Sequence, residues 1–115
     1  MRLPNREQAI ISEHKITEYL LSVSHPYGRH KAAFFMSFGF STESWRLMAS
    51  ALLAHAGEYD VTDMDDTEFG TRYTVEGMLR TPDGRRPIVR VVWFVDKGDN
   101  RPRLVTAYPV GGSIS

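Results

Sequence analysis

The sequence contains no cysteine, and this absence excludes disulfides, zinc sites with thiolate ligands and thiol nucleophiles. It also lacks any apolar run close to the roughly 18 residues that mark a transmembrane helix. The first ten residues, MRLPNREQAI, do not contain the apolar stretch of a signal peptide. We therefore expect a protein that acts in the cytoplasm and does not enter a membrane.

An excess of charge of one sign is also absent, since the net charge is zero. A neutral chain is not expected to bind nucleic acid strongly and non-specifically. The charge is unevenly distributed, however: residues 1–57 carry a net +2, residues 58–70 a net −6 and residues 71–115 a net +4. Two mildly basic blocks flank an acidic insert, so a protein with zero net charge can still have a basic cleft.

Several familiar motifs are missing, among them the P-loop, GxGxxG, H-E-x-x-H and a Ser-His-Asp order. The acidic insert EYDVTDMDDTE, residues 58–68, lacks the D-x-D-x-D-G pattern and the terminal glutamate of a calcium loop. We predict no metal site and no cofactor. The insert is interpreted as a solvated edge strand and loop, whose charges discourage pairing with another strand.

A chain of 115 residues is long enough for one domain with one core. We place that domain at residues 12–110, between tails at 1–11 and 111–115. The first half is predicted to be helical, beginning with a helix that Ser12 caps and that fades at Ser24. A second helix is expected from about residue 29 to residue 38, with Gly39 after its end. The apolar face of the first helix is predicted to hold Ile16, Tyr19 and Leu20.

The third helix is expected to begin after a cap at Ser41 or Thr42 and to end at Gly57. Its predicted apolar stripe consists of Trp45, Met48, Ala49, Leu52 and Leu53. After Gly57 the apolar period changes to two, which predicts strands near residues 59–64, 71–80, 87–96 and 101–109. Alternation in the last strand assigns Leu104, Thr106 and Tyr108 to one face, and Arg103, Val105 and Ala107 to the other.

Helices followed by hairpins indicate the α+β class. We predict three N-terminal helices packed on one face of a four-stranded antiparallel sheet. The other face of such a sheet can remain open and polar.

The stretch HPYGRHKAAFFMSFGF, residues 25–40, places basic side chains against phenylalanines. Lys31 lies one turn from Phe34 in the predicted helix. It is either a lysine whose stem covers aromatic surface or a lysine at a cleft, where it can meet a phosphate or an oxyanion. Gly28, Arg29 and His30 surround the helix start, where free N–H groups can bind an anion. Cations at that end oppose the helix dipole, so their presence suggests another benefit.

The other candidate residues are a histidine and three residues of the last two strands. His25, in the loop before Pro26, is either a general acid or base or a solvent-exposed side chain. Thr106 and Tyr108 can join Arg90 on the open face as a hydroxyl-and-cation surface suited to a phosphodiester. The alternative for that threonine and tyrosine is strand propensity alone. The remaining histidines at or near helix ends, His14 and His55, are predicted to lie on the surface.

The segments KITEYLL, HPYGRHKAAFF, ESW, YTVEGML, VVWFV and LVTAYP resemble an uncharacterised bacterial domain family of about 100 residues. More remotely, the order of elements and the final TAYP resemble the barnase–EndoU–colicin–RelE superfamily, largely small metal-independent ribonucleases, many of them toxins. That resemblance implies functional roles for Lys31, His25, Thr106 and Tyr108. The chain departs from the superfamily in its neutral charge and in having no histidine or glutamate on the last strand.

The leading hypothesis is a toxin-like ribonuclease that cleaves RNA without a metal, with a cognate antitoxin or immunity protein as a possible partner. In it, Lys31 and Arg90 stabilise the phosphorane, His25 moves a proton, and Thr106 and Tyr108 hold the phosphate. The alternative is a non-catalytic binding module, antitoxin-like, immunity-like or accessory, that uses residues 58–68 to bind a basic protein. The sequence leaves the oligomeric state open.

Overall fold

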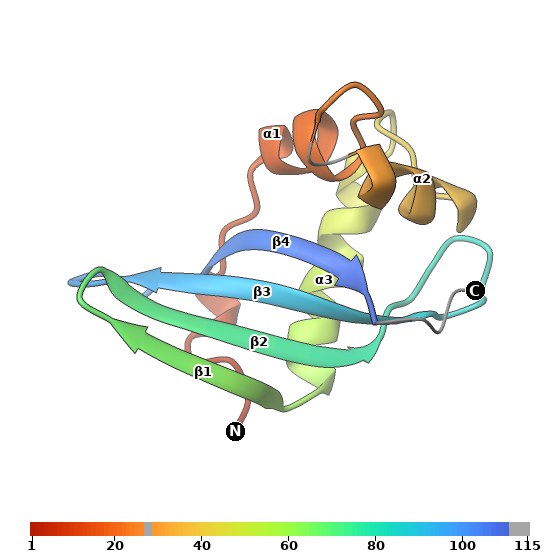
Figure 1. Ribbon diagram of the computed structural model, residues 1–115. Helices are drawn as coiled ribbons and strands as arrows, with labels where there is room; N and C mark the ends of the chain where they lie inside the picture. The colour runs from red at the N-terminus through yellow and green to blue at the C-terminus, as the bar shows by residue number, and fades with distance from the viewer. Residues whose placement is uncertain (27–28, 111–115) are drawn as a thin grey trace.

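The computed structural model describes residues 1–26 and 29–110, and it has the expected α+β architecture (Figure 1). The elements are η1 (Arg6–Gln8), α1 (Glu13–Lys15), η2 (Ile16–Leu20), α2 (Arg29–Ser37), α3 (Trp45–Glu58), β1 (Val61–Thr67), β2 (Gly70–Met78), β3 (Ile88–Asp96) and β4 (Arg103–Pro109). Counting α1 and η2 as one continuous helical segment, three helices precede a four-stranded antiparallel sheet, which confirms the predicted fold class.

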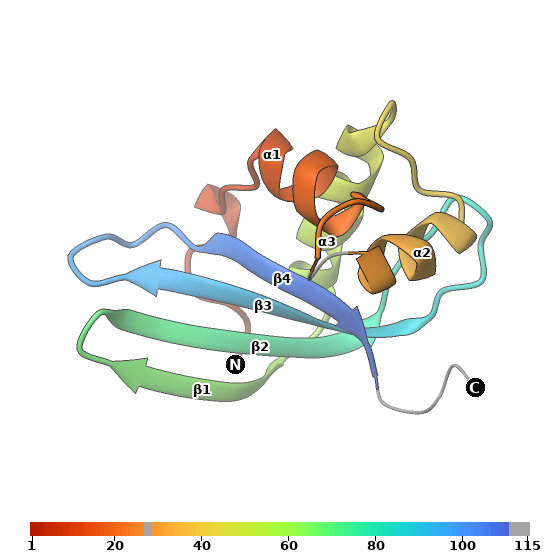
Figure 2. The same ribbon diagram turned by 45° about the horizontal axis from the view of Figure 1, so that its top comes forward.

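The sheet is a simple meander, with strand order β1-β2-β3-β4 and every neighbouring pair antiparallel. The helices gather on one side of it, and α3 packs against β2 (Figures 1 and 2). β4 forms the edge nearest to η2 and α2, whereas β1 forms the opposite edge. The edge at β4 is therefore the place where the helical layer meets the open face of the sheet.

The first helical segment begins as predicted but ends early. The Ser12 hydroxyl accepts a hydrogen bond from Lys15 N at 3.2 Å and so caps α1. From Ile16 onward the chain forms a π-helical turn, in which Leu21 N donates to Ile16 O at 2.8 Å. Wider turns of this kind are uncommon and occur often at functional sites. The turn leaves Tyr19 only partly buried, at the rim of the core.

α3 buries a face that is rotated from the predicted stripe. Its buried residues are Met48, Ala51, Leu52, His55 and Ala56, whereas Leu53 is 38% exposed. Both sets have the same helical spacing, so the apolar pattern alone does not distinguish them. The observed face places Ala51 and Ala56 in the core cluster.

His55 is therefore not a surface residue, as the sequence predicted, but a core residue with 1% exposure. Its Nε2 lies 3.1 Å from Gly77 O on β2, and a carbonyl oxygen can only accept, so Nε2 carries the hydrogen. Burial lowers the pKa of the His55 imidazole, although the Gly77 hydrogen bond and the Glu58 charge raise it. The folded protein thus favours neutral His55.

We expect the free energy of unfolding to fall as the pH drops below about 6.5, the ordinary pKa of histidine. In that range the unfolded chain binds a proton at His55 that the folded chain resists, with a limiting slope of about 1.4 kcal/mol per pH unit. Urea unfolding between about pH 5 and pH 7.5 measures this slope. His55→Gln should reduce it and His14→Gln, at an exposed position, should not. An unchanged slope in His55→Gln would contradict the assignment.

The last strand does not alternate as its sequence predicts. Register shifts between Val92 and Trp93, whose partners on β4 are Thr106 and Leu104, so one residue of β4 is extra. Leu104 and Ala107 are therefore both buried, at 3% and 0% exposure. Such a bulge moves the following side chains to the opposite face. The predicted assignment of Leu104 to the face of Thr106 was wrong.

Residues 1–11, expected to be a tail, pack against the domain. Leu3 is 1% exposed, Met1 O accepts from Val61 N at 2.6 Å, and Ile10 forms a parallel bridge with Arg103. The bridge at Ile10 adds to the β4 edge of the sheet, and the burial of Leu3 makes the N-terminal segment part of the core.

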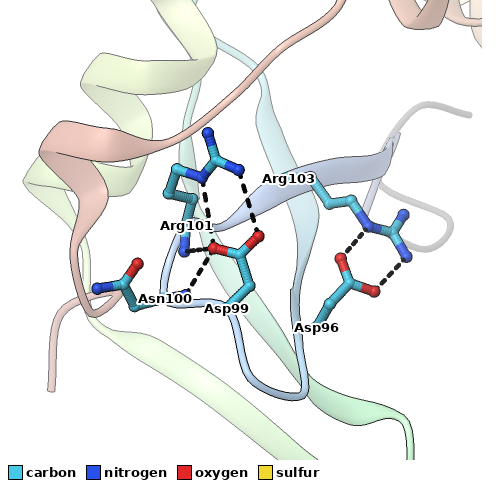
Figure 3. A network of polar contacts seen from close by, with 5 residues as sticks. All are labelled: Asp96, Asp99, Asn100, Arg101 and Arg103. Carbon is cyan, nitrogen blue, oxygen red and sulfur yellow. Dashed lines mark hydrogen bonds and ion pairs between the residues drawn. The ribbon is translucent and has the colours of Figure 1, made fainter.

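Charged residues of the hairpin between β3 and β4 pair with one another (Figure 3). Arg103 donates to both carboxylate oxygens of Asp96, at 2.8 and 3.2 Å. Asp99 accepts from the backbone of Asn100 and from the backbone and side chain of Arg101. Two arginines of the basic C-terminal block are thus paired with aspartates of the same hairpin.

Candidate functional site

Three polar side chains meet where the helical layer reaches β4. Lys31, in the first turn of α2, donates from Nζ to Thr106 Oγ1 on β4 at 2.9 Å. The same ammonium donates to the hydroxyl of Tyr19 on η2. The two hydroxyl oxygens of Tyr19 and Thr106 lie 3.2 Å apart. We call Tyr19, Lys31 and Thr106 the edge triad.

Lys31 has no acidic partner among the residues that the structure describes. Within residues 1–26 and 29–110 no carboxylate forms an ion pair with its ammonium. A partly buried cation held only by hydroxyls keeps most of its attraction for an anion, because charge-assisted bonds are stronger than neutral ones. Lys31 Nζ also lies 4.8 Å from the centre of the Tyr19 ring, so its contacts fit both a lysine at a cleft and a lysine that covers aromatic surface.

Tyr19 is the member of the site that the sequence did not predict as functional. Burial raises the pKa of its phenol, but hydrogen bonds from Lys31 and Thr106 and the charges of Lys31 and Lys15 lower it, and the net shift is downward. The Lys15 ammonium lies 5.1 Å from the centre of the Tyr19 ring. A phenol with a lowered pKa between two cations is a stronger acid than an ordinary tyrosine. The signal in the sequence was the one hydroxyl in an otherwise aliphatic helix face.

His25 lies beside the edge triad. Its ring packs edge-on against that of Tyr19, with ring centres 5.0 Å apart, and its carbonyl accepts from Arg29 N at 3.0 Å. The second contact ties the loop to the start of α2. The structure thus brings His25, Lys31 and Thr106 into one neighbourhood, as the sequence-based hypothesis requires.

The predicted phosphate-binding residues do not all reach this place. Gly28 lies outside the described residues. Arg29 and His30 are exposed on the first turn of α2, and His30 lines a separate cavity on another side of that helix. Their proposed contact with a phosphate remains a prediction.

Arg90 and Tyr108 form a second polar group on the open face. They are cross-strand partners on β3 and β4 and line a cavity of about 310 Å³. Arg90 Nε donates to Glu76 at 2.8 Å, so its charge is largely compensated. A neighbouring cavity of about 420 Å³ is lined by both Thr106 and Tyr108, and this connects the open face to the edge triad.

The described residues contain neither a cluster placed to hold a metal ion nor a helix able to span a membrane. No group of three His, Asp or Glu side chains there is placed to hold a metal ion. None of the helices described is long and apolar enough to cross a membrane.

The model of a family described as "Domain of unknown function (DUF6883)" matches residues 2–111. No curated protein matches the chain. A solved structure, a contact-dependent growth inhibition toxin–immunity protein complex from Klebsiella pneumoniae 342, contains a similar chain with a TM-score of 0.72. The match covers 93% of this chain and 97% of that chain at 15% identity, so it shows a shared fold.

Proposed function

The chain belongs to the DUF6883 family, and we propose that it is a toxin-like ribonuclease that cleaves RNA by attack of a 2′-hydroxyl, without a metal ion. The observation that carries this proposal is the edge triad, in which Lys31 is bound by two hydroxyls and by no carboxylate in the described part of the chain. A phosphodiester offers the negative charge and the acceptor oxygens that such a site lacks.

In the proposed reaction the 2′-oxygen forms a bond to the adjacent phosphorus, and the bond from phosphorus to the 5′-oxygen breaks. The products are a 2′,3′-cyclic phosphate and a 5′-hydroxyl. His25 accepts the proton of the 2′-hydroxyl. Lys31 stabilises the charge on the phosphorane, as donors aimed at developing charge do.

The departing 5′-oxygen needs a proton, and we assign its donation to Tyr19. Its lowered pKa makes it a stronger acid than an ordinary tyrosine. Thr106 and Tyr108 hold the phosphate oxygens from β4. Arg90, paired with Glu76, contributes a more distant positive charge from the open face.

The fold comparison supports a role in a toxin system. The similar chain comes from a structure named as a toxin–immunity protein complex, and a toxin of that kind requires a neutralising partner in its own cell. The resemblance of the final TAYP to the barnase–EndoU–colicin–RelE superfamily supports ribonuclease chemistry in particular. An antitoxin or immunity protein is therefore the partner we propose, and the cytoplasm the compartment where the RNA is met.

A binding module that uses residues 58–68 is the second candidate, because β1 is a sheet edge with strongly exposed acidic side chains. Several of these acids already have partners, however. Asp60 pairs with Arg2, Asp65 with Arg72 and Glu58 with Arg80. The charge left for a basic partner is smaller than the sequence suggests, so the ribonuclease is favoured.

The test is to incubate the purified protein with total bacterial RNA and with tRNA in EDTA. Cleavage products that carry a 2′,3′-cyclic phosphate are expected. The absence of cleavage, with or without added magnesium, would overturn the proposal. Retention of a basic protein that is lost when Asp63, Asp66 and Glu68 are replaced by their amides would favour the binding module.

A further inference from the structure

A larger cavity lies between α2 and the loop that joins β2 to β3. It has a volume of about 770 Å³, within the usual range for ligand sites. Its polar lining includes His30, Arg85 and Arg86, and no carboxylate of the described residues lines it. The remaining lining residues are Ala33, Phe34, Ser37, Phe38, Pro87 and Ile88. We call this cavity the α2 groove.

One wall of the α2 groove is aromatic. The rings of Phe34 and Phe38 have centres 5.0 Å apart, and both side chains remain partly exposed. The guanidinium carbon of Arg85 lies 4.2 Å from the centre of the Phe38 ring. Arg85 is fixed there because it donates to Ser37 O at 2.6 Å and pairs with Asp83 at 2.6 Å. The wall is therefore a rigid aromatic and cationic surface.

Arg86 supplies an uncompensated charge in the lining of the groove. Its guanidinium forms no ion pair or hydrogen bond with any residue that the structure describes. Its backbone has a φ of +53°, which is uncommon for a residue other than glycine, asparagine or aspartate. The loop thus holds an arginine in an unfavourable conformation without giving it an acidic partner.

We propose that the α2 groove binds a nucleobase and its phosphate from single-stranded RNA, next to the bond cleaved at the edge triad. Aromatic faces combined with arginine are the usual platform for unpaired bases. His30 and Lys31 are consecutive residues at the start of α2, so one RNA strand can cross that helix and reach both places. This inference rests on the proposed function, and it adds the substrate class: unpaired or flipped-out nucleotides rather than regular duplex.

The basic side chains of the α2 groove distinguish this occupant from an apolar peptide. A peptide side chain could cover the phenylalanines, but it would leave Arg86 and His30 without a partner. A nucleotide provides a planar ring for the aromatic wall and an anion for Arg86. The observations therefore favour the nucleotide.

The experiment measures fluorescence anisotropy of a labelled tetranucleotide with 2′-O-methyl sugars, beside an abasic oligonucleotide of equal charge. Blocked 2′-oxygens prevent the proposed cleavage, so binding is measured alone. We expect the wild-type protein to bind the base-bearing probe about tenfold more tightly than the abasic one. Phe38→Leu should reduce that preference, and Arg86→Ala should weaken binding of both probes. Arg46→Ala, an exposed arginine that stacks on Trp45 of α3, is the matched control and should change neither.

Equal affinity for the two probes, or wild-type binding by both groove variants, would overturn the inference. So would retention of a hydrophobic peptide in place of either oligonucleotide. The two proposals can fail separately. If RNA cleavage depends on Lys31 but the groove variants bind and cleave normally, only the proposal for the α2 groove fails. If the protein cleaves no RNA, but its base preference depends on Phe38 and its binding of both probes depends on Arg86, only the ribonuclease proposal fails.

Discussion

Replacing Lys31 by methionine is expected to lower RNA cleavage by about a hundredfold to a thousandfold, the usual effect of removing one donor aimed at developing charge. Methionine keeps much of the apolar stem but lacks the ammonium, which binds Thr106 and Tyr19. Because these two hydroxyls also bond to each other, the substitution leaves neither without a partner. The loss should therefore appear in activity far more than in stability.

The measurement is the rate of product formation from tRNA in EDTA, with the fold checked by circular dichroism and urea unfolding. Lys97→Met is the matched control, since it removes the same charge from an exposed turn between β3 and β4. Tyr19→Phe should also reduce the rate and alter its pH dependence, because it removes the proposed acid. Wild-type cleavage by Lys31→Met would exclude the edge triad as the catalytic centre.

The largest expected effect on stability comes from Gly70→Ala at the start of β2. Gly70 is buried, has a φ of +148° and lies where the chain turns from β1 into β2. An added Cβ would lie 2.2 Å from Val95 O and 2.7 Å from an atom of the Phe94 ring. The Phe94 ring can rotate away, but the Val95 carbonyl belongs to the backbone of β3 and cannot move without disturbing the β2–β3 pairing. We expect a loss of about 2–4 kcal/mol in the free energy of unfolding.

Gly98→Ala is a control that separates the cost of the backbone conformation from the cost of the steric clash. Gly98 has a φ of +85°, and nothing lies within 4 Å of an added Cβ. This control should cost about 1 kcal/mol, the strain of a left-handed residue alone. Urea unfolding of both variants measures the difference. Equal losses would show that conformation, and not the contact with Val95, makes Gly70 necessary.

Local patterns account for the parts of the fold that the sequence predicted. The change from a helical period to a period of two separated the helices from the hairpins. Ser12 was correctly identified as a cap, and Gly39, with a φ of +103°, was correctly placed after the second helix. Each of these features depends on residues within one turn of helix or one strand, so neighbouring positions contain the necessary information.

The errors arose where distant segments decide the outcome. The bulge in β4 depends on how β3 and β4 pair, and alternation within one strand cannot reveal it. Burial of His55 depends on which of two overlapping faces of α3 meets the sheet. The packing of residues 1–11 depends on Val61 and Arg103, far along the chain.

The candidate site likewise has features that the sequence determines and features that only the tertiary structure decides. By itself, the sequence determined that a lysine stands at the start of an aromatic helix, that a threonine and a tyrosine occupy the last strand, and that no cysteine competes with them. Only the tertiary structure decided that Lys31 meets Tyr19, 12 positions away, and Thr106, 75 positions away. The physical reason is that periodicity specifies the buried face of each element, whereas a site requires the register and spacing between elements. Those are set by packing of the whole core.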